Sequence, residues 1–201
     1  HAFSGGILEV PLVGNATGNI FVKTANLTLS FTINASSGEL TGDLDNTTIT
    51  TPIPVQAWQS VVSDTASTRY FTAGIAIAVG QIPPPLEDPA YPHGMGFLTL
   101  SLTTKGAATW GGKMPDGSTI TGSSNFVRGG RLPLHLMLYA NTGSAQGWLV
   151  ISGNYLDGTL SWNKSSPVKP STSRNYPKGF PLHDQVVFGI LYTAAANGSI
   201  I

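Results

Sequence analysis

The sequence predicts an all-β fold: a single antiparallel β barrel or sandwich built from short meandering strands. Three observations support this prediction. Apolar and polar residues alternate with a period of two, turn signals rich in Gly, Asn, Asp and Pro recur at short spacing, and no stretch of a dozen residues shows a helical stripe. Strands of a parallel sheet would be apolar on both faces, so the alternation favours antiparallel strands with one solvated face.

The individual strands follow from this alternation in chain order. Residues 27–33 place four apolar side chains on one face and hydroxyl or amide side chains on the other. The segment 68–80 alternates Ile and Val with Ala, which predicts a strand covered on both faces. Leucine recurs at every second position in 98–102 and in 132–138, and each stripe predicts one buried face. The segment 186–193 is expected to be the closing strand.

We expect residues 1–201 to form one β domain, because β sandwiches and barrels of this length commonly fold as a single unit. The Pro-rich connector 81–93 is the candidate boundary between two halves, since proline donates no hydrogen bond to a strand ladder. Two diverged halves are suggested by the resemblance of 27–32 to 98–103.

A second proline-rich segment, 163–184, carries four basic residues and no acid before Asp184. Its prolines exclude it from a ladder, yet Tyr176 and Phe180 give it apolar anchors. We therefore expect it to be ordered across the barrel mouth or a sheet edge, with both rings pointing to the core and the Lys and Arg heads in water.

Composition excludes several classes of protein. Charged residues make up 10% of the chain and the net charge is zero, so nothing attracts phosphate backbones and nucleic-acid binding is not expected. There is no cysteine, which excludes disulfides and thiolate metal sites. No apolar run reaches the ~18 residues of a membrane helix, so we expect no membrane span.

Six of the eleven asparagines begin Asn-x-Ser/Thr triplets, against about two expected by chance. These glycosylation candidates are Asn15, Asn26, Asn34, Asn46, Asn163 and Asn197. Thr-rich strands and Asn-containing turns also generate such triplets incidentally. If the host glycosylates, Asn15, Asn34 and Asn46 should be modified first, because they border turn residues.

The second half of the chain carries a series of short motifs. They are Gly94-Met95-Gly96-Phe97, Gly112 to Gly117, Leu138-Tyr139 with Gly147-Trp148-Leu149, Leu160-Ser161-Trp162, and Tyr176 to Phe180. These motifs resemble an uncharacterised β domain near the C-terminal ends of large secreted, multi-domain bacterial surface proteins. The resemblance implies an extracellular module of a larger polypeptide, with no activity to carry over.

Candidate metal and catalytic residues are few. His1, with a second histidine, has the ingredients of a copper site formed by an N-terminal amine and imidazole, but a processing or cloning boundary explains His1 more simply. Asp43, Asp45 and Asn46 offer calcium ligands, although turn capping explains them better. The pair His183-Asp184 lacks a nucleophile elbow. We therefore expect no cofactor and no catalytic residues.

Aromatic side chains are the remaining candidates for binding. Trp110, Trp148 and Trp162 fall in neighbouring expected strands and, with Trp58, offer a sugar-stacking platform; core packing is the simpler role for each. The leading expectation is a non-catalytic extracellular or cell-surface module for structure, adhesion or assembly, partnered by other subunits or copies of itself. The alternatives are a carbohydrate-binding module that recognises glycans through exposed aromatics, and a secreted enzyme.

Overall fold

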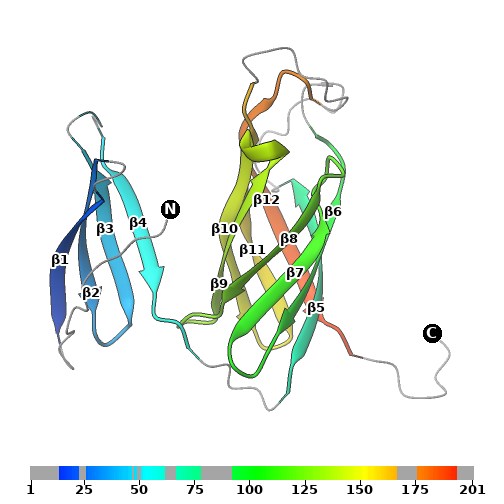
Figure 1. Ribbon diagram of the computed structural model, residues 1–201. Coiled ribbons are helices and arrows are strands. Elements are labelled where there is room, and N and C mark those ends of the chain that lie inside the picture. Colours follow the sequence, from blue (N-terminus) through cyan, green and yellow to red (C-terminus); the bar gives the residue numbers. More distant parts are fainter. Residues whose placement is uncertain are drawn as a thin grey trace. The chain divides into compact units, whose positions relative to one another are not determined.

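The computed structural model describes residues 14–22, 26–46, 48, 51–61, 67–77, 92–166 and 176–193. These residues contain two antiparallel sheets and a single turn of 3-10 helix (Figure 1), which confirms the all-β fold. The contacts divide the chain into two compact units, 1–60 and 61–201, and each unit contains one sheet. That the units fold together as one domain stays a prediction.

The first unit is a four-stranded meander in the order β1-β2-β3-β4. The strands are β1 (Asn15–Val22), β2 (Leu27–Asn34), β3 (Glu39–Asp45) and β4 (Ile53–Trp58). The β2–β3 turn is stabilised by the Asn34 side chain, whose Oδ1 accepts hydrogen bonds from the backbone N–H groups of Ser36 and Ser37. Gly38 then takes a φ of 66°, the left-handed conformation that glycine adopts without steric cost.

Alternation gives this sheet one polar and one apolar face. In register across the four strands, Ala16, Ile33, Leu40 and Ala57 form one apolar row. The opposite face carries mainly threonine, serine, asparagine, glutamine and carboxylate side chains, together with Phe21, Pro54 and Trp58. A hydrophobic stripe on 27–33 is thereby confirmed, with Phe31 buried at 8% exposure.

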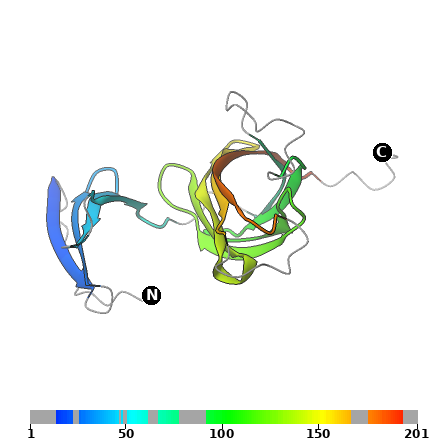
Figure 2. The same cartoon turned by 90° about the horizontal axis from the view of Figure 1, so that it is seen from above.

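The second unit is an eight-stranded antiparallel sheet in the order β8-β7-β6-β5-β12-β11-β10-β9. Its strands are β5 (Arg69–Ile77), β6 (Gly96–Leu102), β7 (Ala107–Lys113), β8 (Thr119–Asn125), β9 (Arg131–Leu138), β10 (Gly143–Ser152), β11 (Tyr155–Lys164) and β12 (Phe180–Leu191). The outermost strands β8 and β9 are consecutive in the chain, so the sheet curls into a nearly closed barrel (Figure 2). A backbone bridge between Val127 and Arg131 joins them at one end.

Buried apolar side chains from all eight strands fill the interior of this barrel. The leucine stripes of β6 and β9 point inward with exposed fractions of at most 5%, as the alternation predicts. Within the segment 68–80, residues 69–77 form β5 as expected, but this strand is covered on one face only, since Tyr70 is 54% exposed. Because β5 pairs with β6, the connector 81–93 joins two neighbouring strands of one sheet.

The expected exclusion of 163–184 from a strand ladder is wrong at both ends, because 163–164 belong to β11 and 180–184 to β12, and Lys164 pairs with Phe180. The described residues between these strands pack against the end of the barrel. Phe180 is 5% exposed, and its ring meets Trp162 edge-on at 4.7 Å and Tyr176 at 5.6 Å between centroids. The expected anchoring by Tyr176 and Phe180 is therefore confirmed. The expectation that the basic heads stay in water is wrong for Lys164, which is 5% exposed because it is on the inward face of β11.

Candidate functional site

The three tryptophans of the barrel unit, Trp110, Trp148 and Trp162, do not form the shared platform that the sequence suggested. Trp110 and Trp162 belong to the barrel core, with 6% and 0% exposure, and so have no face for a ligand. Trp58 and Trp148 are half-buried, in the first and second units respectively. Trp148 borders a shallow cavity of about 350 Å³ on the outer wall, together with Pro133, His135 and Gln146.

Ser161 lines the same shallow cavity and donates a hydrogen bond to the Asp184 carboxylate. This hydrogen bond fixes the direction of the Ser161 hydroxyl, and the side chain of His183 lies outside the described residues. His135 is exposed and is two strands away from Ser161, with Gln146 between them in register. This row of side chains therefore has the composition of a hydrogen-bonding surface.

The glycosylation candidates are distributed over both units. Asn34 and Asn46 each accept a hydrogen bond from the hydroxyl two residues ahead, at 2.6 Å from Ser36 and 2.7 Å from Thr48. Asn15 begins β1, Asn26 precedes β2 with a φ of 50°, and Asn163 faces Ser144 across β10 and β11. Asn197 and His1 lie outside the described residues.

The described residues contain no group of three or more His, Asp or Glu side chains placed to hold a metal ion. Asp43 and Asp45 share one face of β3, whereas the Asn46 carboxamide accepts hydrogen bonds from Thr48. The capping role expected as the simpler explanation of Asn46 is therefore confirmed. In the described part of the chain, no helix is long and apolar enough to cross a membrane.

The outer wall of the barrel carries six exposed apolar side chains on β5, β6 and β11 and along and just after β12, with the exposed Thr72 and Thr99 among them. We call this surface the aromatic wall; its residues are Tyr70, Phe97, Tyr155, Phe188, Ile190 and Tyr192. Strand pairing places Phe188 two strands from Phe97, across Gly74, and Ile190 directly opposite Tyr155. The Tyr155 and Phe188 rings stack with centroids 6.4 Å apart.

The wall is large for a surface that faces only water. Its six side chains are 48–61% exposed, which amounts to about 650 Å² of accessible surface, since a side chain of this kind presents roughly 200 Å². The largest apolar patch of a typical monomer covers about 300–600 Å². This surface was not predicted from the sequence, although the inward Phe71, Ala73 and Ile75 imply that Tyr70 points outward.

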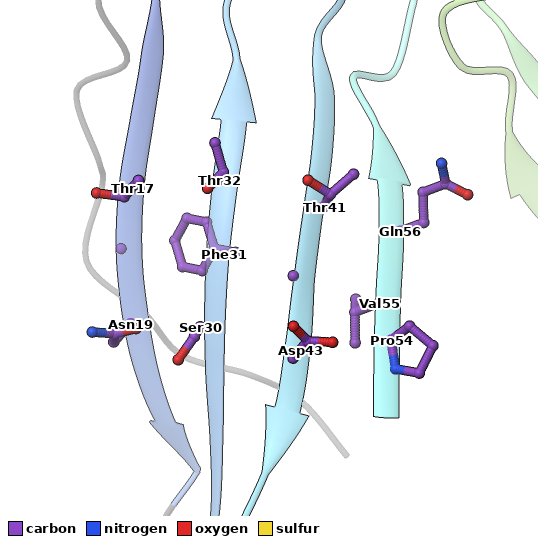
Figure 3. A pocket seen from close by; sticks show the side chains of 12 residues that line it. Thr17, Asn19, Ser30, Phe31, Thr32, Thr41, Asp43, Pro54, Val55 and Gln56 are labelled. Atoms are coloured by element: carbon purple, nitrogen blue, oxygen red, sulfur yellow. The ribbon is translucent and has the colours of Figure 1, made fainter. Parts of the chain in front are cut away.

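The first unit has a groove that runs across its four strands (Figure 3), which we call the transverse groove; its volume is about 880 Å³. Two rows in register form its walls. They are Thr17, Thr32, Thr41 and Gln56, and Asn19, Ser30, Asp43 and Pro54. The row between them is Gly18, Phe31, Gly42 and Val55. Because side chains alternate between faces, this middle row contributes backbone as the floor of the groove.

Glycines in the middle row allow the strands to pack closely behind this floor. A Cβ on Gly18 would lie 2.8 Å from Cζ of Phe31, so the phenyl ring covers β1 at that point. Beside the groove, Gln56 Nε2 donates to Glu39 Oε1 at 2.6 Å, which fixes the amide. Trp58 is opposite Glu39 in register and shares the polar face with Gln56.

A polar cluster fastens the barrel at the end opposite the Val127–Arg131 bridge. The Tyr139 hydroxyl donates to Asp116 Oδ2 at 2.5 Å, which links the turn before β8 to the turn after β9. Ser118 donates to the same carboxylate through its backbone N–H and its hydroxyl, each at 2.9 Å. Lys164 Nζ lies over the Tyr139 ring, 4.7 Å from the centroid.

Electrostatics at this cluster follow from burial. Burial raises the pKa of Tyr139 well above its usual range, and the hydrogen bond to Asp116 adds to the shift. Burial lowers the pKa of Lys164, and the nearby Asp116 carboxylate opposes that change. The cluster therefore keeps its phenol neutral, and its contacts join strand ends that the backbone leaves unpaired.

Comparison with known proteins found no matching family model, no matching curated protein and no matching solved structure. Two surfaces of the chain have the size and composition of binding sites, the aromatic wall and the transverse groove.

Proposed function

We propose that this chain is a non-catalytic assembly module of an extracellular surface, and that its barrel unit binds a second copy of the chain through the aromatic wall. The observation that carries the proposal is the gathering of six exposed apolar side chains on one wall. The barrel unit exposes eight large apolar side chains among its described residues, and six of them belong to this surface.

The area of the wall supports a second copy as the partner. A stable interface buries about 800 Å² on each partner, and the six exposed residues of the wall, phenol groups included, present about 650 Å². An isologous dimer buries the same patch twice, so a neutral apolar patch is complementary to itself. The phenols of Tyr70, Tyr155 and Tyr192 can still meet water at the rim, as is common for tyrosine at interfaces.

Charge also supports self-association. The wall contains no charged side chain, and the chain as a whole has no net charge, so two copies do not repel each other. Asp157 pairs with Phe188 at one margin, and Lys113 pairs with Phe97 at the other. Neither charge has to be buried when the central strands β5 and β12 meet a partner.

Sedimentation velocity over a wide concentration range tests the proposal. The native chain should show a reversible monomer–dimer equilibrium, and the double variant Phe188→Ser/Ile190→Ser should be monomeric because it removes the centre of the wall. Met137→Ser is the matched control: Met137 is 54% exposed, like Ile190, but is on β9. A native chain that stays monomeric at every concentration contradicts the proposal, as does an equal loss of dimer in the control.

A further inference from the structure

We propose that the transverse groove is a binding site for an uncharged carbohydrate chain, whose sugar rings lie across the four strands of the first unit. This proposal is independent of the assembly proposed above, because no residue of the aromatic wall lines the groove. The proposed glycan site uses the side chains that line the groove, whereas the tryptophans considered from the sequence, Trp110 and Trp162, are buried.

The chemistry of the walls matches that of a sugar. The three threonines and Ser30 each offer one donor and two acceptor lone pairs, and the amides of Asn19 and Gln56 offer both kinds of group. A pyranose hydroxyl also donates and accepts hydrogen bonds, so these side chains can act either as its acceptor or as its donor. These residues come from four neighbouring strands and face the groove in two parallel rows (Figure 3).

The charge of the groove selects against anionic ligands. Asp43 is the one charged side chain among the twelve lining residues, and none of the twelve is basic. Phosphate and carboxylate ligands are recognised by Arg, Lys or clustered backbone N–H groups, which this lining does not supply. A neutral glycan meets no repulsion here, and a carboxylate is a good acceptor for its hydroxyl groups.

The shape suits an extended polymer. The groove crosses three inter-strand spacings of about 4.8 Å, a length of about 14 Å, and so exceeds a single pyranose ring. Its walls are side chains on paired strands, which hold their positions better than a loop would. Trp58 continues the polar face two residues beyond Gln56 and places an aromatic ring beside the groove, where the C–H face of a sugar can pack.

Isothermal titration of the full chain with neutral hexasaccharides tests the proposal, with cellohexaose, laminarihexaose and maltohexaose as probes of three linkages. At least one should bind. Thr32→Val and Thr41→Val keep side-chain volume and strand propensity but remove a hydroxyl each, so each should weaken that binding roughly three- to tenfold. Thr28→Val is the matched control, because Thr28 is on the same strand and face as Thr32 but outside the groove.

Three outcomes overturn the proposal. They are no binding of any hexasaccharide, equal weakening by Thr28→Val and Thr32→Val, and equal or tighter binding of an anionic oligogalacturonate. The Phe188→Ser/Ile190→Ser variant should bind the hexasaccharide as the native chain does. Loss of dimer with intact sugar binding, or the reverse, therefore shows which of the two proposals has failed.

Discussion

Replacing Tyr139 by Phe should destabilise the barrel by about 1.5 kcal/mol. The hydroxyl donates to the Asp116 carboxylate at 2.5 Å, and a hydrogen bond to a charged group contributes about 1.5–3 kcal/mol. We take the lower end because Tyr139 is partly exposed and Asp116 keeps two donors from Ser118. The ring contacts with Phe180 and Lys164 do not involve the hydroxyl, so phenylalanine retains them.

Urea unfolding followed by tryptophan fluorescence measures this change. Tyr155→Phe is the control, because Tyr155 is 54% exposed on the outer wall and should change the free energy of unfolding by less than about 0.5 kcal/mol. A double-mutant cycle with Asp116→Ala should give a coupling energy of about 1 kcal/mol. Equal effects of Tyr139→Phe and Tyr155→Phe, or no coupling to Asp116, would refute the view that this contact fastens the barrel.

Three further predictions concern pH, backbone strain and modification. Folding raises the pKa of Tyr139, so the contribution of this phenol to stability is fully present below its unfolded pKa of about 10 and is lost as the pH rises above that value. The difference in unfolding free energy between the native chain and Tyr139→Phe should therefore shrink in urea titrations at alkaline pH. A difference that does not change with pH contradicts this. Ala140 has a φ of 53°, a left-handed conformation that is strained for alanine. Ala140→Gly relieves this strain but makes the unfolded chain more flexible, and the net effect should be to raise the free energy of unfolding by about 0.5 kcal/mol. A decrease measured by urea unfolding would count against the left-handed turn. If the host glycosylates, Asn34 should carry a glycan, because it lies at an exposed turn where its Oδ1 accepts hydrogen bonds from Ser36 and Ser37. The intact mass of Asn34→Gln should then be lower than that of the native protein by the mass of one glycan. A mass without that loss shows that Asn34 carries no glycan.

The fold class and five of the strands, β2, β5, β6, β9 and the second half of β12, could be predicted because alternation is a local signal. The inward leucines of β6 and β9 needed only parity along one strand. Parity failed where both faces are apolar. In β12, Val187 points inward while Phe188 and Ile190 are exposed. Because apolar residues occur at both odd and even positions of this strand, its sequence does not show which face is buried.

The two binding surfaces could not be predicted because each depends on which strands are neighbours. The aromatic wall requires β5 to pair with β12, strands more than a hundred residues apart in the chain. The transverse groove requires the register of all four strands, since a shift of one residue would turn its polar walls to the other face. Trp110 and Trp162 could have been assigned to the core by their parity with Ala108 and Leu160.

Hydroxyl-radical footprinting of the native chain at low and high concentration tests the central claim, self-association through the aromatic wall, most directly. Oxidation of Phe188, Tyr155 and Tyr192 should fall as concentration rises, because these exposed rings become buried against a second copy. Met137, which is equally exposed on β9, should be oxidised at the same rate throughout. Equal oxidation of Phe188 at both concentrations, or protection of Met137 to the same extent, would contradict the account.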